Sequence, residues 1–359
     1  MRRIYLKISV MNKDLKISRI LRLRMFPVFL LVAVSIISCN LTETSKIPVI
    51  FDTDANNEVD DQHALAYLLF SGDHFKVEGV TVNSTSTPES IMDKSDVKDH
   101  YNEAKRVMQL CGNLFGKIPL KIGAQDSFDE IKNYIGQPEF DGFEAVNFII
   151  EQAMKKRNKK LVLLPVGKLT NIALALMKEP AIAEKVRIVW LGSNYPEPGE
   201  HNQDWDIESM NYILDVDVPF EIVTVRGGKP SGTAAVMVSK DQILHRMPGK
   251  GPKIKTPVTG RHGGQFTCFG DYSVSLFEQY GMWGNPPGRA LFDMAAVAVV
   301  KDPGFAEKKE IPAPVYVNEK WVERPNNPRK ITIWEWFDIY GIPSDFFKTM
   351  DDYKLVKTK

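Results

Sequence analysis

The sequence predicts an α/β fold with a single open, mostly parallel sheet flanked by helices. Strand and helix patterns alternate along the chain, as they do where crossover helices connect parallel strands. The first strand pattern is a short apolar run of the kind that is buried on both faces of a sheet. No internal repeat or low-complexity linker interrupts residues 46–345. These observations favour one large domain.

The expected elements follow in chain order. Short runs rich in β-branched and aromatic residues predict strands at Val49–Phe51, Val77–Val82, Leu161–Val166, Val186–Leu191 and Phe220–Val225. Longer runs with apolar residues at helical spacing predict helices at His63–Ser71, Lys98–Cys111, Phe143–Lys156, Leu169–Met177, Ile207–Leu214, Val274–Tyr280 and Phe292–Lys301. The expected organisation is a signal peptide over residues 1–39, a tether over residues 40–46, one α/β domain over residues 47–345 and a C-terminal tail over residues 346–359.

The amino-terminal segment has the pattern of a secretory signal. Basic residues from Arg2 to Arg24 precede an apolar run, Met25 to Ile37, that is shorter than a typical membrane span. Ser38 and Cys39 end this run and resemble a bacterial lipobox, which predicts lipidation at Cys39 and a membrane-anchored location in the cell envelope, periplasmic or surface-exposed. An uncleaved anchor and a cleavage site without lipid remain the alternatives.

Composition limits the classes of partner. The 359 residues are 43% hydrophobic and 25% charged, with a formal net charge of +1, so no nucleic-acid partner is expected. Two cysteines follow Cys39, namely Cys111 and Cys268. The sequence leaves open whether they pair or remain free thiols.

A cluster of acids follows the first predicted strand. The segment after Phe51 contains Asp52, Asp54, Glu58, Asp60 and Asp61 before the helical pattern begins. Ligands bind at the carboxyl ends of strands in open α/β sheets, and several carboxylates gathered there repel one another unless a cation neutralises them. Oxygen ligands suit a hard ion such as calcium or magnesium. A divalent-metal site is therefore predicted, with a solvated acidic helix start as the alternative.

Two known acidic motifs do not fit this segment. An EF-hand loop counted from Asp52 requires glycine at the sixth position and glutamate at the twelfth, where this chain has Asn57 and His63. A haloacid-dehalogenase phosphatase usually has Thr or Val where Asn56 stands. It also needs a downstream lysine and acidic pair in the right order, and Asp351-Asp352 lies too near the terminus.

The segment does resemble the calcium-binding loop of the nucleoside hydrolases. In that family an Asp-x-Asp pair closes on a second Asp-Asp pair and runs into an apolar helix, as Asp52, Asp54, Asp60 and Asp61 do before Ala64-Leu65. This chain has two more residues between the pairs and lacks the family's Pro-Gly. The resemblance implies the nucleoside hydrolase fold, with a Rossmann-like core and its site at the carboxyl ends of the strands.

Three later segments carry the same resemblance in the family's order. Gly167-Lys168-Leu169-Thr170-Asn171 is similar to the family's Gly-Pro-Leu-Thr-Asn, and Glu200-His201-Asn202 is similar to its Glu-Phe-Asn. Phe292-Asp293 resembles its His-Asp at the start of an apolar helix. The matched segments run from residue 49 to about residue 298, which is most of the chain after the signal peptide.

The resemblance implies calcium-dependent hydrolysis of the N-glycosidic bond of ribonucleosides. It implies that calcium is bound by Asp54, Asp61, Asp293 and the main-chain carbonyl of Val166, and that Asp54 is the general base. The implied sugar contacts are Asp60, Asn194, Glu200 and Asn202. A small nucleoside or related N-riboside is the implied substrate, and a homo-oligomer is a possible assembly.

Phe292 replaces the histidine that protonates the leaving base in some family members. The candidates to assist departure of the base are therefore His201, His262 and stacking by Trp205 or Trp283, of which we choose His201. The alternative function is a catalytically weak or inactive calcium-dependent glycoside or glycan receptor of the same fold, anchored by lipid.

Overall fold

The structure is a computed structural model that describes residues 46–56, 58–85 and 96–358. The predicted signal peptide, Cys39 and most of the tether lie outside the described residues. The chain from Ser45 to Lys359 forms one compact unit. Within the described part of the chain, no helix has the length and apolar character needed to span a membrane.

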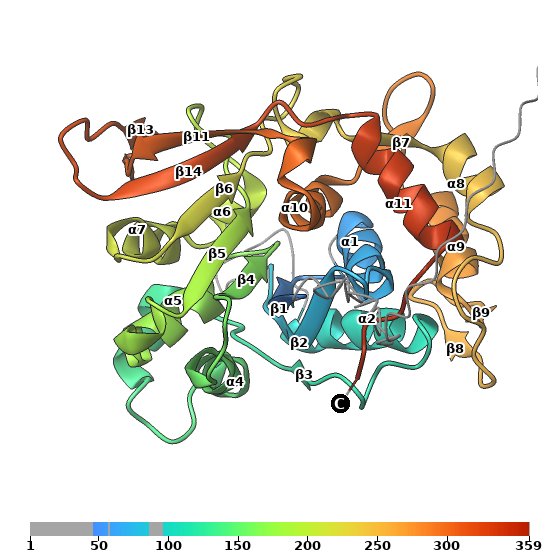
Figure 1. Cartoon of the computed structure of the whole chain (residues 1–359), viewed down its shortest axis with the longest axis horizontal. Coiled ribbons are helices and arrows are strands. Elements are labelled where there is room, and N and C mark those ends of the chain that lie inside the picture. The colour runs from blue at the N-terminus through green and yellow to red at the C-terminus, as the bar shows by residue number, and fades with distance from the viewer. Residues whose placement is uncertain (1–45, 57, 86–95, 359) are drawn as a thin grey trace, which may run out of the picture. The chain divides into compact units, whose positions relative to one another are not determined.

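An eight-stranded sheet organises this unit (Figure 1). Its strands, in spatial order, are β11 (Glu307–Pro312), β14 (Lys330–Glu335), β6 (Phe220–Val223), β5 (Val186–Leu191), β4 (Leu161–Pro165), β1 (Ile47–Thr53), β2 (Phe75–Val82) and β3 (Leu120–Lys121). All neighbours pair in parallel except β11, which is antiparallel to β14. The sequence-based prediction of an open, mostly parallel α/β sheet is confirmed.

The helices cover both faces of this sheet. The helices of the unit are α1 (Asp60–Phe70), α2 (Val97–Leu110), α3 (Phe128–Ile131), α4 (Phe143–Met154), α5 (Thr170–Lys178), α6 (His201–Asp204), α7 (Ile207–Asp215), α8 (Lys240–Arg246), α9 (Phe269–Gln279), α10 (Phe292–Lys301) and α11 (Gly341–Asp351). Figure 1 shows α4, α5 and α7 on one side of the strands and α1, α2 and α10 on the other.

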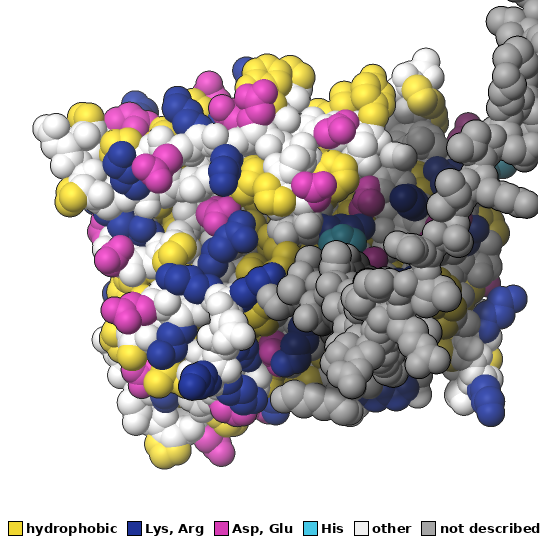
Figure 2. Space-filling model, viewed as in Figure 1, with side chains coloured by type: hydrophobic (Ala, Val, Ile, Leu, Met, Phe, Trp, Pro, Cys, Tyr) yellow, Lys and Arg dark blue, Asp and Glu magenta, His cyan; other side chains and the backbone are white. Residues whose placement is uncertain are grey.

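Three small two-stranded sheets complete the unit: β7 (Met237–Ser239) with β10 (Gly288–Ala290), β8 (Val258–Thr259) with β9 (Gln265–Phe266), and β12 (Val315–Val317) with β13 (Lys320–Val322). The space-filling view shows basic and acidic side chains interspersed over the visible face, without a large patch of one sign (Figure 2).

Side chains that alternate along the strands supply two apolar cores. Val49 and Phe51 of β1 pack with α1, α2 and α10, whereas Ile50 packs on the opposite side with α4 and α5. β4 alternates in the same way, with Val162 and Leu164 on the first side and Leu163 on the second. Alternation between two buried faces explains why these strands are apolar along their whole length.

The order of the strands in the sheet creates a typical ligand-binding position at the carboxyl end of β1. From β1 the chain moves to β2 and β3 on one side and to β4, β5 and β6 on the other, so the order reverses between β1 and β4. Ligands bind outside the carboxyl ends of strands at such a reversal. Asp54 follows β1 and Val166 follows β4 at this point.

The predicted strands and helices are present, with ends that differ by a few residues from the prediction. The sheet also contains β11 and β14, which the sequence did not predict. Lys330–Glu335 buries Ile331, Ile333 and Trp334, and it joins β6 in parallel. The predicted domain boundary at residue 345 falls inside α11, where Phe346 and Met350 are buried. The residues just after that boundary therefore pack on the body of the unit.

Candidate active site

Three carboxylates converge between the starts of two adjacent helices. Asp60 and Asp61 form the first turn of α1, Asp293 lies in the first turn of α10, and these helices pack against each other. One carboxylate oxygen from each residue lies within 4.8 Å of the others, and all three side chains are buried. Helix N-termini favour negative charge, which helps to hold acids at both positions.

Burial and mutual repulsion raise the pKa of each of these acids. Burial raises the pKa of Asp60, and the charges of Glu58 and Asp61 raise it further. The pKa of Asp61 rises to about 6 mainly through burial, although the Thr53 hydroxyl lowers it by donating to Oδ1 at 2.5 Å. Burial and the charges of Asp60 and Asp61 raise the pKa of Asp293. A divalent cation would relieve this repulsion.

Asp54 lines the same pocket from the carboxyl end of β1. Its side chain is 2% exposed, and its pKa is raised by burial and then by Asp61 and Asp60. A Cβ atom at Gly167 would come within 2.8 Å of Asp54 Oδ1, so only glycine leaves room for this carboxylate. Asp54 does not belong to the tight group of Asp60, Asp61 and Asp293.

Asp52 faces a hydrogen-bond network instead of the pocket. Its carboxylate accepts hydrogen bonds from Thr81 at 2.5 Å, Asn83 at 2.5 Å and Asn171 at 2.8 Å. Asn171 also accepts from the main chain of Ala124 and donates to the Val82 carbonyl. The Leu-Thr-Asn segment of the sequence therefore ties α5 to β1 and β2 beneath the site.

The Val166 carbonyl is available at the pocket beside these acids. Val166 lines the pocket, and its carbonyl accepts a hydrogen bond from Asn202 Nδ2 at 2.8 Å. The same amide nitrogen donates to the Leu191 carbonyl at 3.1 Å. Asn202 thus fixes the ends of β4 and β5 relative to α6.

Glu200 and Asn194 lie on the wall of the pocket formed by the loop after β5. Glu200 caps α6, and its Oε2 accepts from the main-chain nitrogens of Ser193 at 2.7 Å and Gln203 at 3.1 Å. Burial raises the pKa of Glu200 to about 7. Asn194 uses its side chain to join the Gly199 carbonyl to the main-chain nitrogen of Gly227. Both residues line the pocket.

His201 is the histidine that the structure brings to this pocket. It begins α6, its side chain is exposed, and its Nε2 accepts a hydrogen bond from Trp205 Nε1 at 2.8 Å. An accepting Nε2 in a neutral imidazole leaves the proton on Nδ1. Phe292 also lines the pocket, at the position where the sequence lacks the expected histidine.

The other candidates for assisting the leaving group lie outside the described lining of the pocket. His262 lies in the loop between β8 and β9, where its Nε2 accepts from Arg261. Trp283 stacks against Arg289, with the guanidinium carbon 3.5 Å from the ring centroid. The cavity of about 200 Å³ therefore presents His201 but neither of these residues.

Sequence reasoning gave no role to Glu58, although it also lines the cavity. Its carboxylate forms an ion pair with Arg289, a residue that no motif identified. The available signal was the acidic motif itself, because Glu58 lies in the two-residue extension between the Asp pairs. Leu191, Val225 and Gly227 complete the lining, and their positions follow only from the ends of β5 and β6.

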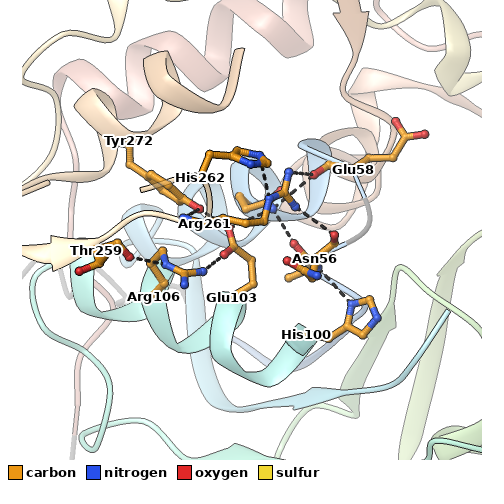
Figure 3. A network of polar contacts seen from close by, with 11 residues as sticks. Asn56, Glu58, His100, Glu103, Arg106, Thr259, Arg261, His262 and Tyr272 are labelled. Carbon is orange, nitrogen blue, oxygen red and sulfur yellow. Dashed lines mark hydrogen bonds and ion pairs between the residues drawn. The ribbon is translucent and has the colours of Figure 1, made fainter. Parts of the chain in front are cut away.

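A polar network holds the acidic loop against the β8–β9 hairpin (Figure 3). Arg261 donates to the carbonyls of Asn56 at 3.0 Å and Glu58 at 3.1 Å. Beneath it, Glu103 accepts from Tyr272 at 2.6 Å and from Gln62 at 3.1 Å. The loop that precedes Asp60 is therefore supported from outside by side chains of two other elements.

The donor set fits a hard divalent cation. The carboxylates of Asp60, Asp61 and Asp293 lie close together, and Asp54 and Val166 line the same pocket. Burial and mutual repulsion raise the pKa of these acids, and a cation would offset both effects. Glu200, His201 and Asn202 occupy the wall formed by α6. This arrangement can hold a polyhydroxylated ring between a cation and fixed hydrogen-bonding groups.

Residues 49–334 match the family described as inosine-uridine preferring nucleoside hydrolase. A protein of that description from Crithidia fasciculata is 32% identical over 111 residues, which cover 31% of this chain and 32% of the relative. A putative pyrimidine-specific ribonucleoside hydrolase, RihB, from Shigella boydii is 26% identical over 181 residues, covering 48% and 67%. The chain thus matches about a third of the first relative's length and two thirds of the second's.

The fold agrees with solved structures over nearly their whole length. A purine-preferring ribonucleoside hydrolase from Gardnerella vaginalis superposes with a TM-score of 0.61 at 20% identity, covering 84% of this chain and 98% of the other. At this identity the likeness establishes a shared fold.

Proposed function

The chain belongs to the inosine-uridine preferring nucleoside hydrolase family, and we propose that it hydrolyses the N-glycosidic bond of ribonucleosides or related N-ribosides, with calcium as its cofactor. One observation carries this proposal. Asp54, Asp60, Asp61 and Asp293 share a single pocket with Glu200 and Asn202 at the carboxyl ends of β1 and β4. The products are free ribose and a base.

Calcium would be held by Asp54, Asp61, Asp293 and the Val166 carbonyl. Its six to eight oxygen ligands leave positions for water and sugar hydroxyls, and its charge would orient that water and lower the water's pKa. An Asp60 carboxylate oxygen lies as close to those of Asp61 and Asp293 as they lie to each other, within 4.8 Å. Asp60 would therefore either bind the calcium ion with them or bind a sugar hydroxyl beside it. The close approach of these groups supports both roles.

Asp54 is the general base of the proposed reaction. Its carboxylate takes a proton from the attacking water as the oxygen approaches the anomeric carbon. Positive charge develops on the ribosyl ring as the bond to the base lengthens, and the surrounding carboxylates stabilise that charge. The narrow fit beside Gly167 fixes the position of the Asp54 carboxylate.

Glu200 and Asn202 orient the sugar, and His201 supplies a proton to a neutral leaving base. Glu200 and Asn202 are held by main-chain partners, and Asn202 Nδ2 already donates to the Val166 and Leu191 carbonyls, so the two residues present fixed acceptor oxygens to the ribose hydroxyls. His201 lies between Glu200 and Asn202 in the sequence, and its side chain is more exposed than either of theirs. The departing base would pass this exposed side of the pocket. The hydrogen bond from Trp205 orients the neutral imidazole ring, which becomes an acid only when Nε2 is protonated and this hydrogen bond is given up.

The direct test is release of free ribose from a panel of purine and pyrimidine nucleosides. The assay uses the chain from Asn40 onward, with calcium or with a chelator, beside an Asp54→Ala variant. Calcium-dependent release that the substitution abolishes is the expected result. Calcium binding without ribose release from any member of the panel would instead favour a receptor. Phe292 motivates this alternative, because it replaces the histidine that protonates the leaving base in some family members.

The location of the protein belongs to the same proposal. The basic and apolar amino-terminal pattern ending at Cys39 supports a lipid-anchored protein of the bacterial cell envelope. Metabolic labelling with a radioactive fatty acid tests this, since Cys39→Ala should abolish the label.

A further inference from the structure

Glu58 lies at the rim of the pocket, above the carboxylates of the floor. Its side chain is 31% exposed, whereas Asp60, Asp61 and Asp293 are 5%, 3% and 2% exposed. All four residues line the same cavity. Since the buried acids are the groups proposed to hold the cation and the ribose, the part of a substrate beyond the ribose ring must extend towards the rim.

The position of Glu58 is fixed from two directions. Its carboxylate forms an ion pair with Arg289, whose side chain is only 3% exposed. Arg289 in turn stacks on Tyr280 and Trp283, with its guanidinium carbon 4.6 Å and 3.5 Å from the two ring centroids. From the other side, Arg261 donates to the Glu58 carbonyl at 3.1 Å (Figure 3). These contacts hold the Glu58 carboxylate in a fixed position at the rim of the pocket.

Negative charge dominates the pocket. Six carboxylates line it, from Asp54, Glu58, Asp60, Asp61, Glu200 and Asp293. Among its described lining residues there is no lysine or arginine. Arg289 behind Glu58 and one divalent cation supply three positive charges, half the number of carboxylates. The remaining field attracts a cationic ligand and repels an anionic one.

The chemistry of departure favours the same class of substrate. When water adds to the anomeric carbon, the electron pair of the C–N bond leaves with the base nitrogen. A neutral base then departs as an anion unless it receives a proton, whereas a cationic aglycone departs as a neutral molecule. Phe292 lines the pocket without a proton to give. A positively charged aglycone needs no such donor.

Resting on the proposed hydrolase function, we propose that Glu58 is a specificity-determining residue that selects N-ribosides whose aglycone carries a positive charge. Its carboxylate interacts with the aglycone at the rim, while the floor holds the ribose. The interaction strengthens binding of the charged substrate, so it acts mainly through KM.

A pair of isomeric substrates isolates this charge. 1-Methyladenosine is protonated and cationic at neutral pH, whereas its isomer N6-methyladenosine has the same heavy atoms and is neutral. We expect Glu58→Gln to lower the ratio of kcat/KM for the cationic isomer over the neutral isomer by about tenfold, chiefly through a higher KM. Glu197→Gln is the matched control, because it removes an exposed carboxylate outside this cavity and should leave the ratio unchanged.

A binding measurement removes the dependence on turnover. Calorimetry on an Asp54→Asn background, at a calcium concentration that saturates the variant in a direct calcium titration, compares nicotinamide riboside, which is cationic, with its neutral carbon isostere benzamide riboside. The affinity ratio should fall by about tenfold when Glu58→Gln is added. Equal losses for both ligands, or an unchanged ratio, would overturn the proposal for Glu58. Failure of every nucleoside to release ribose would instead refute the hydrolase function.

Discussion

His201 and Phe292 both line the pocket, and of the two only His201 has a side chain that can carry a proton. Phe292 occupies the position where the sequence resemblance implies a histidine, and its ring offers no proton. His201 lines the same cavity, and Trp205 Nε1 donates to its Nε2 at 2.8 Å. This hydrogen bond leaves Nδ1 as the nitrogen that can carry a proton. In the proposed reaction, a neutral leaving base would receive its proton from this exposed imidazole.

Replacing His201 by Gln should affect substrates according to their leaving groups. For inosine, which leaves as a poorly stabilised anion, we expect kcat to fall by about 10²-fold, the usual lower range for a lost general acid. For p-nitrophenyl riboside, whose anion is stable, the change should be about threefold or less. Steady-state kinetics on both substrates measure the difference. His74→Gln, an exposed histidine outside the cavity, is the control, and equal losses on both substrates would contradict the role of His201.

The loop between β1 and α1 depends on neighbouring elements for its shape. Arg261 of the β8–β9 hairpin donates to the Asn56 and Glu58 carbonyls, and Gln62 donates to the Ala55 carbonyl at 2.5 Å. These contacts replace the turn that Pro-Gly would impose in a shorter loop. The loop precedes Asp60 and Asp61, so its order bears directly on the arrangement of the acids.

Arg261→Met should weaken calcium binding, because the acidic loop loses two charged hydrogen bonds. We expect the dissociation constant to rise by about tenfold, measured by calorimetry. Arg261→Lys should recover little of this loss, since an ammonium group cannot span two carbonyls as the guanidinium does. Arg246→Met removes a partly exposed arginine that pairs with Asp351 and serves as the control. Unchanged affinity in Arg261→Met would show that the loop is ordered without the hairpin.

Helix α11 is part of the apolar core. Phe346 is fully buried against His63, Tyr67 and Phe347. We expect Phe346→Ala to lower the free energy of unfolding by about 3–5 kcal/mol, the usual cost of such a cavity. Tyr340→Ala, at a side chain that is 82% exposed, should change it by about 0.5 kcal/mol or less. Urea unfolding measures the free energy of unfolding of both variants. If Phe346→Ala changed it as little as Tyr340→Ala does, α11 would be loosely packed.

Local patterns predicted the central strands because those strands are continuously apolar. They did not predict β14, where Lys330, Thr332 and Glu335 alternate with buried residues and the segment resembled a basic and aromatic tail. The acids after β1 could be found because charge at a strand end is conspicuous, whereas Glu200 and Asp293 were identified only through the family resemblance of their segments. Arg289 and Arg261 could not, since their partners are 231 and more than 200 residues away in the chain.

The whole unit uses one edge of a parallel sheet to assemble a site from distant segments. Asp54 follows β1, Val166 follows β4, and the starts of α1 and α10 contribute Asp61 and Asp293. The helices on both faces leave the carboxyl ends of the strands open to ligands. Concentrating acids in this way makes the unit's stability depend on pH and on cations.

The calcium-induced rise in Tm should decrease as pH falls through about 6. The fold raises the pKa of Asp61 to about 6, above the value near 4 of an unfolded aspartate. The metal-free fold therefore holds a proton that the unfolded chain has released, and this contribution to stability is lost as pH rises through that interval. Calcium must displace the proton, so it stabilises most above about pH 6. Calorimetric scans with and without calcium test this, and a pH-independent increment would contradict it.

The most direct test of the central claim is the rate of ribose release measured against free calcium concentration. The wild-type chain should show a saturable rise from a negligible rate in chelator. Asp293→Asn should require at least about tenfold more calcium for half-saturation, because one ligand has lost its charge. Asp129→Asn, at an exposed acid of α3, should follow the wild-type curve. Ribose release that is independent of calcium, or unaffected by Asp293→Asn, would contradict the assignment of these carboxylates to a catalytic metal site.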